Sequence, residues 1–164
     1  MKNPELSTLI RTIESVHSLT VYYSSLIKDT DVFKHFEVNG IKMNSLYWLT
    51  AHIANSESLL LLKALGGKHH NVKWLEEYDY GSSKDLTPTV TYKELVQIAK
   101  EIHTNSIAFL KTLNDEDLQK DNLINFTIEG SSSFKNTIIH HIRHQGIHTG
   151  HLSTLCLLNK VKTF

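Results

Sequence analysis

Histidines crowd the C-terminal part of the chain. Five of the eleven histidines fall within twelve residues: His140, His141, His144, His148 and His151. On a helix, which turns by about 100° per residue, all five imidazoles lie within an arc of about 100° and share one face. Unpaired polar rings buried on such a face would each cost roughly 1 to 3 kcal/mol, so a partner must satisfy them. A transition metal ion is the simplest partner, and we expect this segment to bind one.

The spacing of these histidines limits which of them can share an ion. Residues four apart on a helix have Cβ atoms about 5 to 6 Å apart, so two imidazoles can reach one ion at roughly 2.1 Å. Pairs three apart can serve as well, and the possible pairs are His140/His144, His144/His148, His141/His144 and His148/His151. A tight site also needs a ligand from another helix. Three histidines on or beside apolar faces are candidates, namely His17, His52 and His103.

Four helices are expected to position these histidines. Their start signals are Asn3 before Pro4, Asn44 or Ser45, the capping box Thr91–Glu94, and Ser131–Ser133. The first three are expected to end at about Lys28, at Gly66–Gly67 and at Asn114–Asp115, and the fourth is expected to continue through Leu158. The chain is therefore predicted to be all-α, a four-helix bundle forming one domain over residues 1–164.

The predicted connections are long. They cover about residues 29–43, 67–90 and 115–130, longer than the roughly 2 to 8 residues common between helices of a bundle. Long loops often carry function, so any of them could cover one end of a site. We expect Asn122–Ile128 to form a short extended segment, and His35, His69 and His70 to be solvated loop residues.

The composition argues against several classes of partner. Lys and Arg together number 17, as do Asp and Glu, so no electropositive field is expected to hold nucleic acid. No apolar run approaches the roughly 20 residues that cross a membrane. The single cysteine, Cys156, is expected to be a buried apolar residue. The start of the chain lacks the pattern of a signal peptide, and we expect a cytoplasmic protein.

Two segments resemble a known family. The stretch 48–57 (WLTAHIANSE) and the stretch 144–152 (HQGIHTGHL) are similar to those of the DinB/YfiT-like family of metalloenzymes. In that family, a histidine on the second helix and an H-x3-H pair on the last helix bind a divalent metal, and a glycine follows two places later. The resemblance implies His52, His144 and His148 as metal ligands, with Gly150 as the trailing glycine. It also implies an up-down-down-up bundle and a homodimer.

The chain departs from the family around the last ligands. The usual run is close to H-E-x-x-H-R-G-Q, whereas this chain has Gln145, Thr149 and His151 at the positions of the acid, arginine and glutamine. We expect Gln145 and His151 to orient the ligand rings instead. The additional His140 and His141 are expected to be packing residues.

Several other residues near these motifs are given ordinary roles. His17 and His103 are expected to be hydrogen-bonded core residues, and Tyr47 and Trp48 to pack in the core. Glu57 is expected to be a solvated or ring-orienting carboxylate. The loop segment 74–78 could supply polar contacts to the site.

The expected site favours chemistry over scaffolding. Three imidazoles leave a coordination position open, and nitrogen ligands suit zinc, nickel, iron or copper better than magnesium or calcium. A bound dication turns water or a thiol into a nucleophile near neutral pH. We therefore expect a metal-dependent enzyme that hydrolyses a small-molecule substrate or transfers a thiol to an electrophile. The resemblance implies a low-molecular-weight thiol such as bacillithiol or mycothiol. The alternative is a non-catalytic, stress-related metal-binding bundle whose helices mediate dimerisation.

Overall fold

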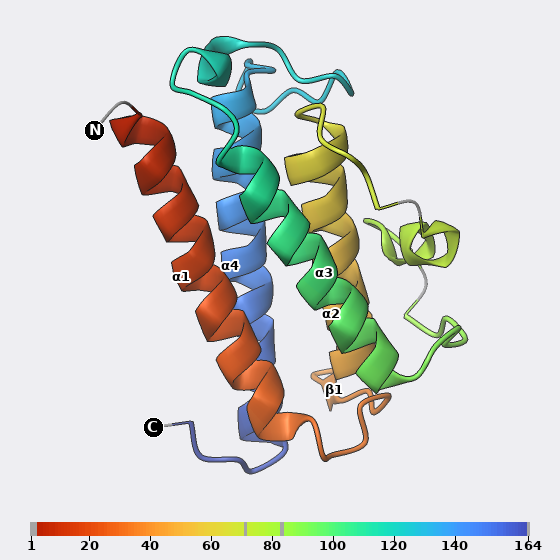
Figure 1. Ribbon diagram of the computed structural model, residues 1–164. Helices are drawn as coiled ribbons and strands as arrows, with labels where there is room; N and C mark the ends of the chain where they lie inside the picture. The colour runs from red at the N-terminus through yellow and green to blue at the C-terminus, as the bar shows by residue number, and fades with distance from the viewer. Residues whose placement is uncertain (1–2, 71, 83, 164) are drawn as a thin grey trace.

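Four long helices make up the protein. A computed structural model describes residues 3–70, 72–82 and 84–163. The long helices are α1 (Pro4–Ile27), α2 (Leu46–Glu57), α3 (Tyr92–Leu110) and α4 (Phe134–Leu158). In Figure 1, α1 and α4 descend from the end of the molecule that carries the N-terminus, while α2 and α3 rise towards it. The predicted all-α fold, a bundle of up-down-down-up order, is confirmed.

The second helix changes its winding part of the way along. Directly after Glu57, the π-helix η1 (Ser58–Lys63) continues α2, and Gly66 then turns the chain with a φ of +86°. Glycine adopts such a positive φ readily because it lacks a Cβ atom. The turn at Gly66 agrees with the helix end predicted at Gly66–Gly67. Nothing in the sequence predicted the π-helix. Segments of this kind are frequent at functional sites.

The first helix is not capped as expected. The Asn3 side chain makes no capping hydrogen bond. The carboxylate of Asp115 accepts hydrogen bonds from the backbone N–H groups of Leu6 at 2.9 Å and Glu5 at 3.3 Å. A residue far along the chain therefore satisfies the free donors of this helix end.

The other helix starts follow local signals, and one helix end does not. The Ser45 and Ser133 side chains accept from backbone N–H groups in the first turns of α2 and α4, and the capping box of Thr91 and Glu94 is present at α3. However, α3 ends at Leu110, earlier than the predicted Asn114–Asp115.

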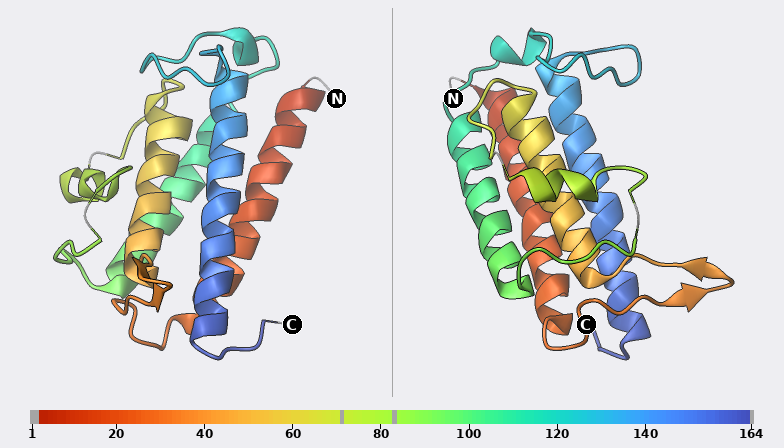
Figure 2. Two further views of the ribbon diagram at one scale, coloured as in Figure 1. Left: turned by 180° about the vertical axis from the view of Figure 1, so that it is seen from behind. Right: turned by 90° about the vertical axis from the view of Figure 1, so that its right-hand side faces the viewer.

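The connections contain short elements of their own. The first includes a hairpin of β1 (Glu37–Val38) and β2 (Ile41–Lys42), and the second includes the 3-10 helix η2 (Lys73–Tyr78), which packs beside α2 (Figure 2). The third contains the 3-10 helix η3 (Asp117–Gln119). The extended segment predicted at Asn122–Ile128 is wrong, because the structure assigns only isolated bridges around it. The Asn122 side chain closes this loop instead: its Nδ2 donates to the carbonyl of Phe126, and its Oδ1 accepts from the N–H of Phe126.

The core consists of two apolar clusters stacked along the bundle. One includes Leu49, Leu95 and Leu152, and the other includes Ile13 and Leu110. In the packing of the helices, α1 contacts mainly α4, and α2 contacts mainly α3. The level between the two clusters is occupied by polar side chains.

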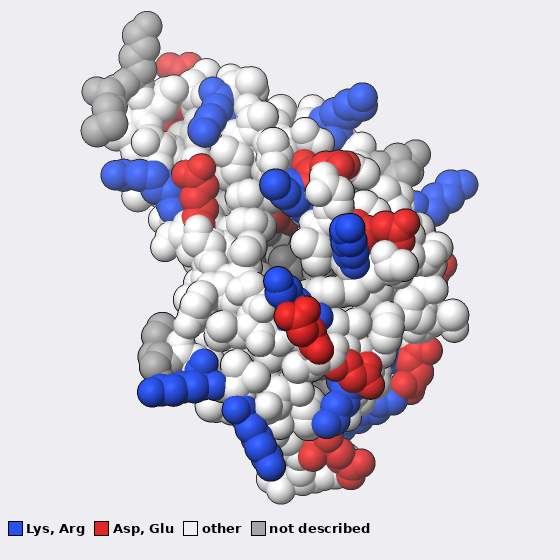
Figure 3. All heavy atoms as spheres, turned by 60° about the horizontal axis from the view of Figure 1, so that its bottom comes forward, with Lys and Arg blue, Asp and Glu red and all other residues white. Residues whose placement is uncertain are grey.

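The surface carries both signs of charge. On the face shown in Figure 3, Lys and Arg side chains are interspersed with Asp and Glu side chains. Among the described residues, no helix combines the length and apolar character that crossing a membrane requires.

Candidate metal centre

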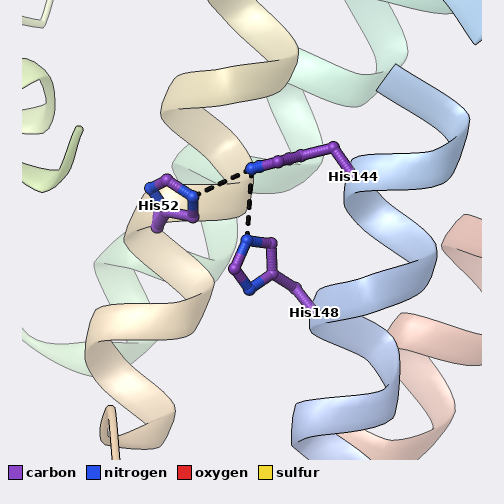
Figure 4. Close-up of side chains that lie close together, drawn as sticks. All are labelled: His52, His144 and His148. Carbon is purple, nitrogen blue, oxygen red and sulfur yellow. Dashed lines mark hydrogen bonds between the residues drawn. The ribbon is translucent and has the colours of Figure 1, made fainter. Parts of the chain in front are cut away.

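Three histidines from two helices converge on one point. His52 projects from α2, and His144 and His148 project from successive turns of α4 (Figure 4). The Nε2 atom of His144 lies 3.0 Å from Nε2 of His52 and 3.1 Å from Nε2 of His148. One nitrogen from each ring lies within 4.8 Å of the others. The structure thus brings together His144 and His148, one of the pairs that the spacing allows. The third ring at this point is that of His52, not that of His17 or His103.

His52 is held on both sides by its surroundings. Its Nδ1 atom donates a hydrogen bond of 2.6 Å to the backbone carbonyl of Tyr78, in η2. The ring of Trp48, one turn earlier on α2, stacks on it with 4.7 Å between the ring centroids. Because Nδ1 carries the proton, the lone pair of Nε2 is directed at the two histidines of α4. The loop segment 74–78 therefore does contribute a polar contact, through its backbone.

Only one of the two residues expected to orient the ligand rings does so. The Nδ1 atom of His151 lies 3.2 Å from Nδ1 of His148, which leaves Nε2 of His148 facing the other two rings. The expectation for Gln145 is wrong, because its side-chain amide donates instead to Thr20 at 3.3 Å and to Nδ1 of His17 at 3.4 Å, on α1.

The three rings are electrically suited to bind a cation. Burial lowers the pKa of His52, and burial together with the neighbouring histidines lowers the pKa values of His144 and His148 to about 3. All three imidazoles are therefore neutral at pH 7 and offer lone pairs. In a tetrahedral site, two nitrogens that each lie about 2.1 Å from the ion are about 3.4 Å apart. The observed separations of 3.0 and 3.1 Å are a few tenths of an ångström shorter, so a small outward movement of the rings lets this donor set hold a divalent transition metal.

The remaining histidines of α4 have different roles. His140 packs against Phe126, with 5.2 Å between the ring centroids, as expected of a packing residue. His141 is 1% exposed and lies in the bundle interior. The shared helix face therefore does not make one shared site, because side chains at different heights on α4 meet different residues of the other helices.

A second group of titratable side chains lies in the bundle interior. His17, Glu57 and His103 each bring one potential ligand atom within 4.8 Å of the others. The expectation of a solvated Glu57 is wrong, because this residue is 2% exposed and accepts a hydrogen bond of 2.8 Å from Nδ1 of His103. The ring that Glu57 orients is that of His103, which lies outside the three-histidine cluster. Sequence spacing gave no signal of this group, because its members come from three different helices.

A cavity of about 480 Å³ lies beside the three-histidine cluster. Trp48 and Tyr78, which both contact His52, line this cavity, but none of the three histidines does. Apart from Tyr47, which belongs to α2, the rest of its wall comes from the segments before α2 and α3 and includes Phe33, Lys84 and Asp85. The sequence did not predict this cavity, because its walls come from segments that meet only in the folded chain.

Comparison with known proteins identifies a family. The family model of the DinB superfamily matches residues 22–152, a range that includes His52, His144 and His148. A comparison with curated proteins finds no significant match.

Proposed function

This chain belongs to the DinB superfamily, and from that premise we propose that it is a metal-dependent enzyme that acts on a small molecule. The reaction is either the transfer of a low-molecular-weight thiol to an electrophile or a hydrolysis. One observation carries the proposal: three neutral imidazoles from two helices direct their Nε2 atoms at one point. His144 and His148 are only partly buried, so small molecules can reach this point.

A divalent transition metal, with zinc, nickel and iron as candidates, supplies Lewis acidity that makes a thiol or water nucleophilic near neutral pH. The chain's own residues fix the geometry. Tyr78 and Trp48 hold the ring of His52, and His151 holds that of His148. No acidic side chain belongs to the three-histidine group, so its ligands bring no negative charge that would weaken this acidity.

The neighbouring cavity is the proposed position of the substrate. Phe33, Tyr47 and Trp48 give it aromatic walls, and Lys84 and Asp85 add charged groups. A mostly apolar pocket with a few polar groups is typical of small-molecule sites. Trp48 lines the cavity and also stacks on His52, so a molecule bound there is separated from this proposed metal ligand by a single side chain.

A direct assay tests the proposal. Zinc-loaded protein is incubated with bacillithiol or cysteine and a chloro- or epoxide-bearing acceptor, and separately with ester and amide substrates, and products are quantified by mass spectrometry. We expect turnover in one of the two series that a chelator removes and zinc restores. His52→Ala should abolish it, whereas His140→Ala, on α4 but outside the cluster, should retain it. Absence of turnover in both series with zinc, nickel and iron would reject catalysis and favour a non-catalytic metal-binding protein.

The homodimer is a proposal with separate support. On the face of α4 turned away from the bundle, Ile147 is 60% exposed and Leu157 is 66% exposed. Gly146 and Gly150 lie on the same face, and a Cβ atom at either would meet nothing within 4 Å. Such a face allows close approach of a second helix. A cytoplasmic location is part of the same proposal and is supported by the single, buried Cys156.

A further inference from the structure

A polar layer crosses the middle of the bundle. Between the two apolar clusters, each helix contributes a polar side chain at the same level: His17 from α1, Glu57 from α2, His103 from α3 and His141 from α4. The electrostatic neighbours of the Glu57 carboxylate are these three histidines, so the four side chains face one another. Bundle cores are normally filled by apolar residues at such positions.

The donor types of this layer are those of a ligand set. Nδ1 of His103 donates to Oε1 of Glu57 at 2.8 Å. The rings of His17 and His103 stack in parallel, with 3.4 Å between centroids and 3° between planes, so one ring must turn before both can direct a lone pair at one ion. One potential ligand atom from each of His17, Glu57 and His103 lies within 4.8 Å of the other two.

Unsatisfied polar atoms beside this group provide a second, independent observation. Neither ring nitrogen of His141 makes a hydrogen bond of normal geometry among the described residues, although the residue is 1% exposed. The Oε1 atom of Gln145 is likewise buried and makes no hydrogen bond of normal geometry among the described residues, although its side chain lies near the ring of His141. Leaving such groups unpaired is costly, and in a native core it calls for an explanation.

We propose that His17, Glu57 and His103 form a second metal centre, separate from the three-histidine cluster and specific for a divalent transition ion such as zinc. Two imidazoles and one carboxylate are an established ligand combination for zinc and for iron. The ion replaces the proton that His103 shares with Glu57 and supplies the positive charge that a buried carboxylate requires. The π-helix η1 begins directly after Glu57, in line with the association of such segments with functional sites.

The two centres are distinct in space. His52 and Glu57 are five residues apart on α2, which corresponds to about 7.5 Å along a helix axis. His52 faces Tyr78 and His144, whereas Glu57 faces His103. The proposed second centre therefore stands or falls independently of the proposed function of the first.

The competing interpretation is that Glu57 and His103 form a purely structural ion pair. Zinc stoichiometry distinguishes the two. Equilibrium dialysis followed by elemental analysis is applied to the wild type, His144→Ala, Glu57→Gln and the double variant, with His140→Ala as the control. Glutamine keeps the shape of the side chain and can still accept the hydrogen bond from His103, but it loses the charge. Circular dichroism checks that each variant is folded.

We expect two zinc ions per chain in the wild type and the control, one in each single variant and none in the double variant. One ion in the wild type with none in His144→Ala, or two ions retained in Glu57→Gln, would overturn the second centre. A measurement on the wild type alone covers the case in which a variant does not fold. Zinc-edge anomalous diffraction should show a peak between His17, Glu57 and His103, and an absent peak at saturating zinc would equally reject the proposal.

Discussion

Removing His144 should eliminate most of the stabilisation that zinc gives through the three-histidine cluster. The Nε2 atom of His144 contacts the corresponding atoms of both other rings, at 3.0 and 3.1 Å. Its loss leaves two rings on different helices without the nitrogen that lies between them. Because disturbing a group that merely orients a ligand weakens metal binding by about 10- to 100-fold, we expect loss of a ligand itself to raise Kd by roughly 100-fold or more.

The size of the effect follows from binding linkage. At a free zinc concentration of about 100 times Kd, one site stabilises the wild type by about 2.7 kcal/mol. For a chain of this size, each kcal/mol shifts Tm by about 2 to 4 °C, so zinc bound at this site should raise Tm by about 5 to 11 °C. With Kd raised about 100-fold, the same zinc concentration gives His144→Ala only about 0.4 kcal/mol, or about 1 to 2 °C.

Differential scanning calorimetry with and without zinc measures this difference, with His140→Ala as the matched control. The ring of His140 lies 5.9 Å from that of His144 between centroids, and it is outside the three-histidine group. Any stabilisation from the proposed second centre is common to all three proteins and cancels in the comparison. If His144→Ala kept the full zinc shift, or if His140→Ala lost it, the assignment of His144/His148 as the ligand pair on α4 would be wrong.

Two further predictions concern the protein without metal. Burial raises the pKa of Tyr78 to about 12 and also raises the pKa of Tyr47, so between about pH 10 and 12 the unfolded state binds fewer protons than the folded state. Stability should therefore fall as pH rises through this range, by up to about 1.4 kcal/mol per pH unit for the phenol of Tyr78, and urea unfolding that showed no such fall would contradict the burial of this residue. Asp115→Ala should cost about 1 kcal/mol of unfolding free energy because it removes the acceptor of two N–H groups at the start of α1. Asn3→Ala, which removes only the acceptor of the Asp115 backbone N–H, should cost less. A larger loss for Asn3→Ala than for Asp115→Ala in urea titrations would contradict Asp115 as the main acceptor at this helix end.

Features encoded by neighbouring residues could be predicted from the sequence. The capping box of Thr91 and Glu94 involves residues three apart, and the start of α3 follows it. The spacing of His144 and His148 likewise places their rings on successive turns of one helix. In both cases the chemistry depends only on helix geometry, which does not need the rest of the fold.

Features that depend on distant residues could not be predicted. The acceptor at the start of α1 is Asp115, and the hydrogen-bond partner of His52 is the carbonyl of Tyr78, in a loop. The π-helix Ser58–Lys63, directly after Glu57, has no counterpart in the sequence signals used to predict the helices. Helix periodicity placed His141 and His148 on the same face of α4, yet only His148 joins the three-histidine cluster. Periodicity gives the direction of a side chain, but it does not give the residues of the other helices that the side chain contacts.

The polar layer is difficult to explain by stability alone. Burying Glu57 requires that its charge be compensated, and replacing a buried ion pair with apolar residues of similar volume is often neutral or stabilising, by about 1 to 4 kcal/mol. His141 adds a buried ring whose nitrogens lack hydrogen bonds of normal geometry among the described residues. Apolar side chains at these positions would join the two apolar clusters into one continuous core. A layer that interrupts the core at this cost is accounted for if His17, Glu57 and His103 hold an ion, since the ion supplies the charge that the carboxylate needs.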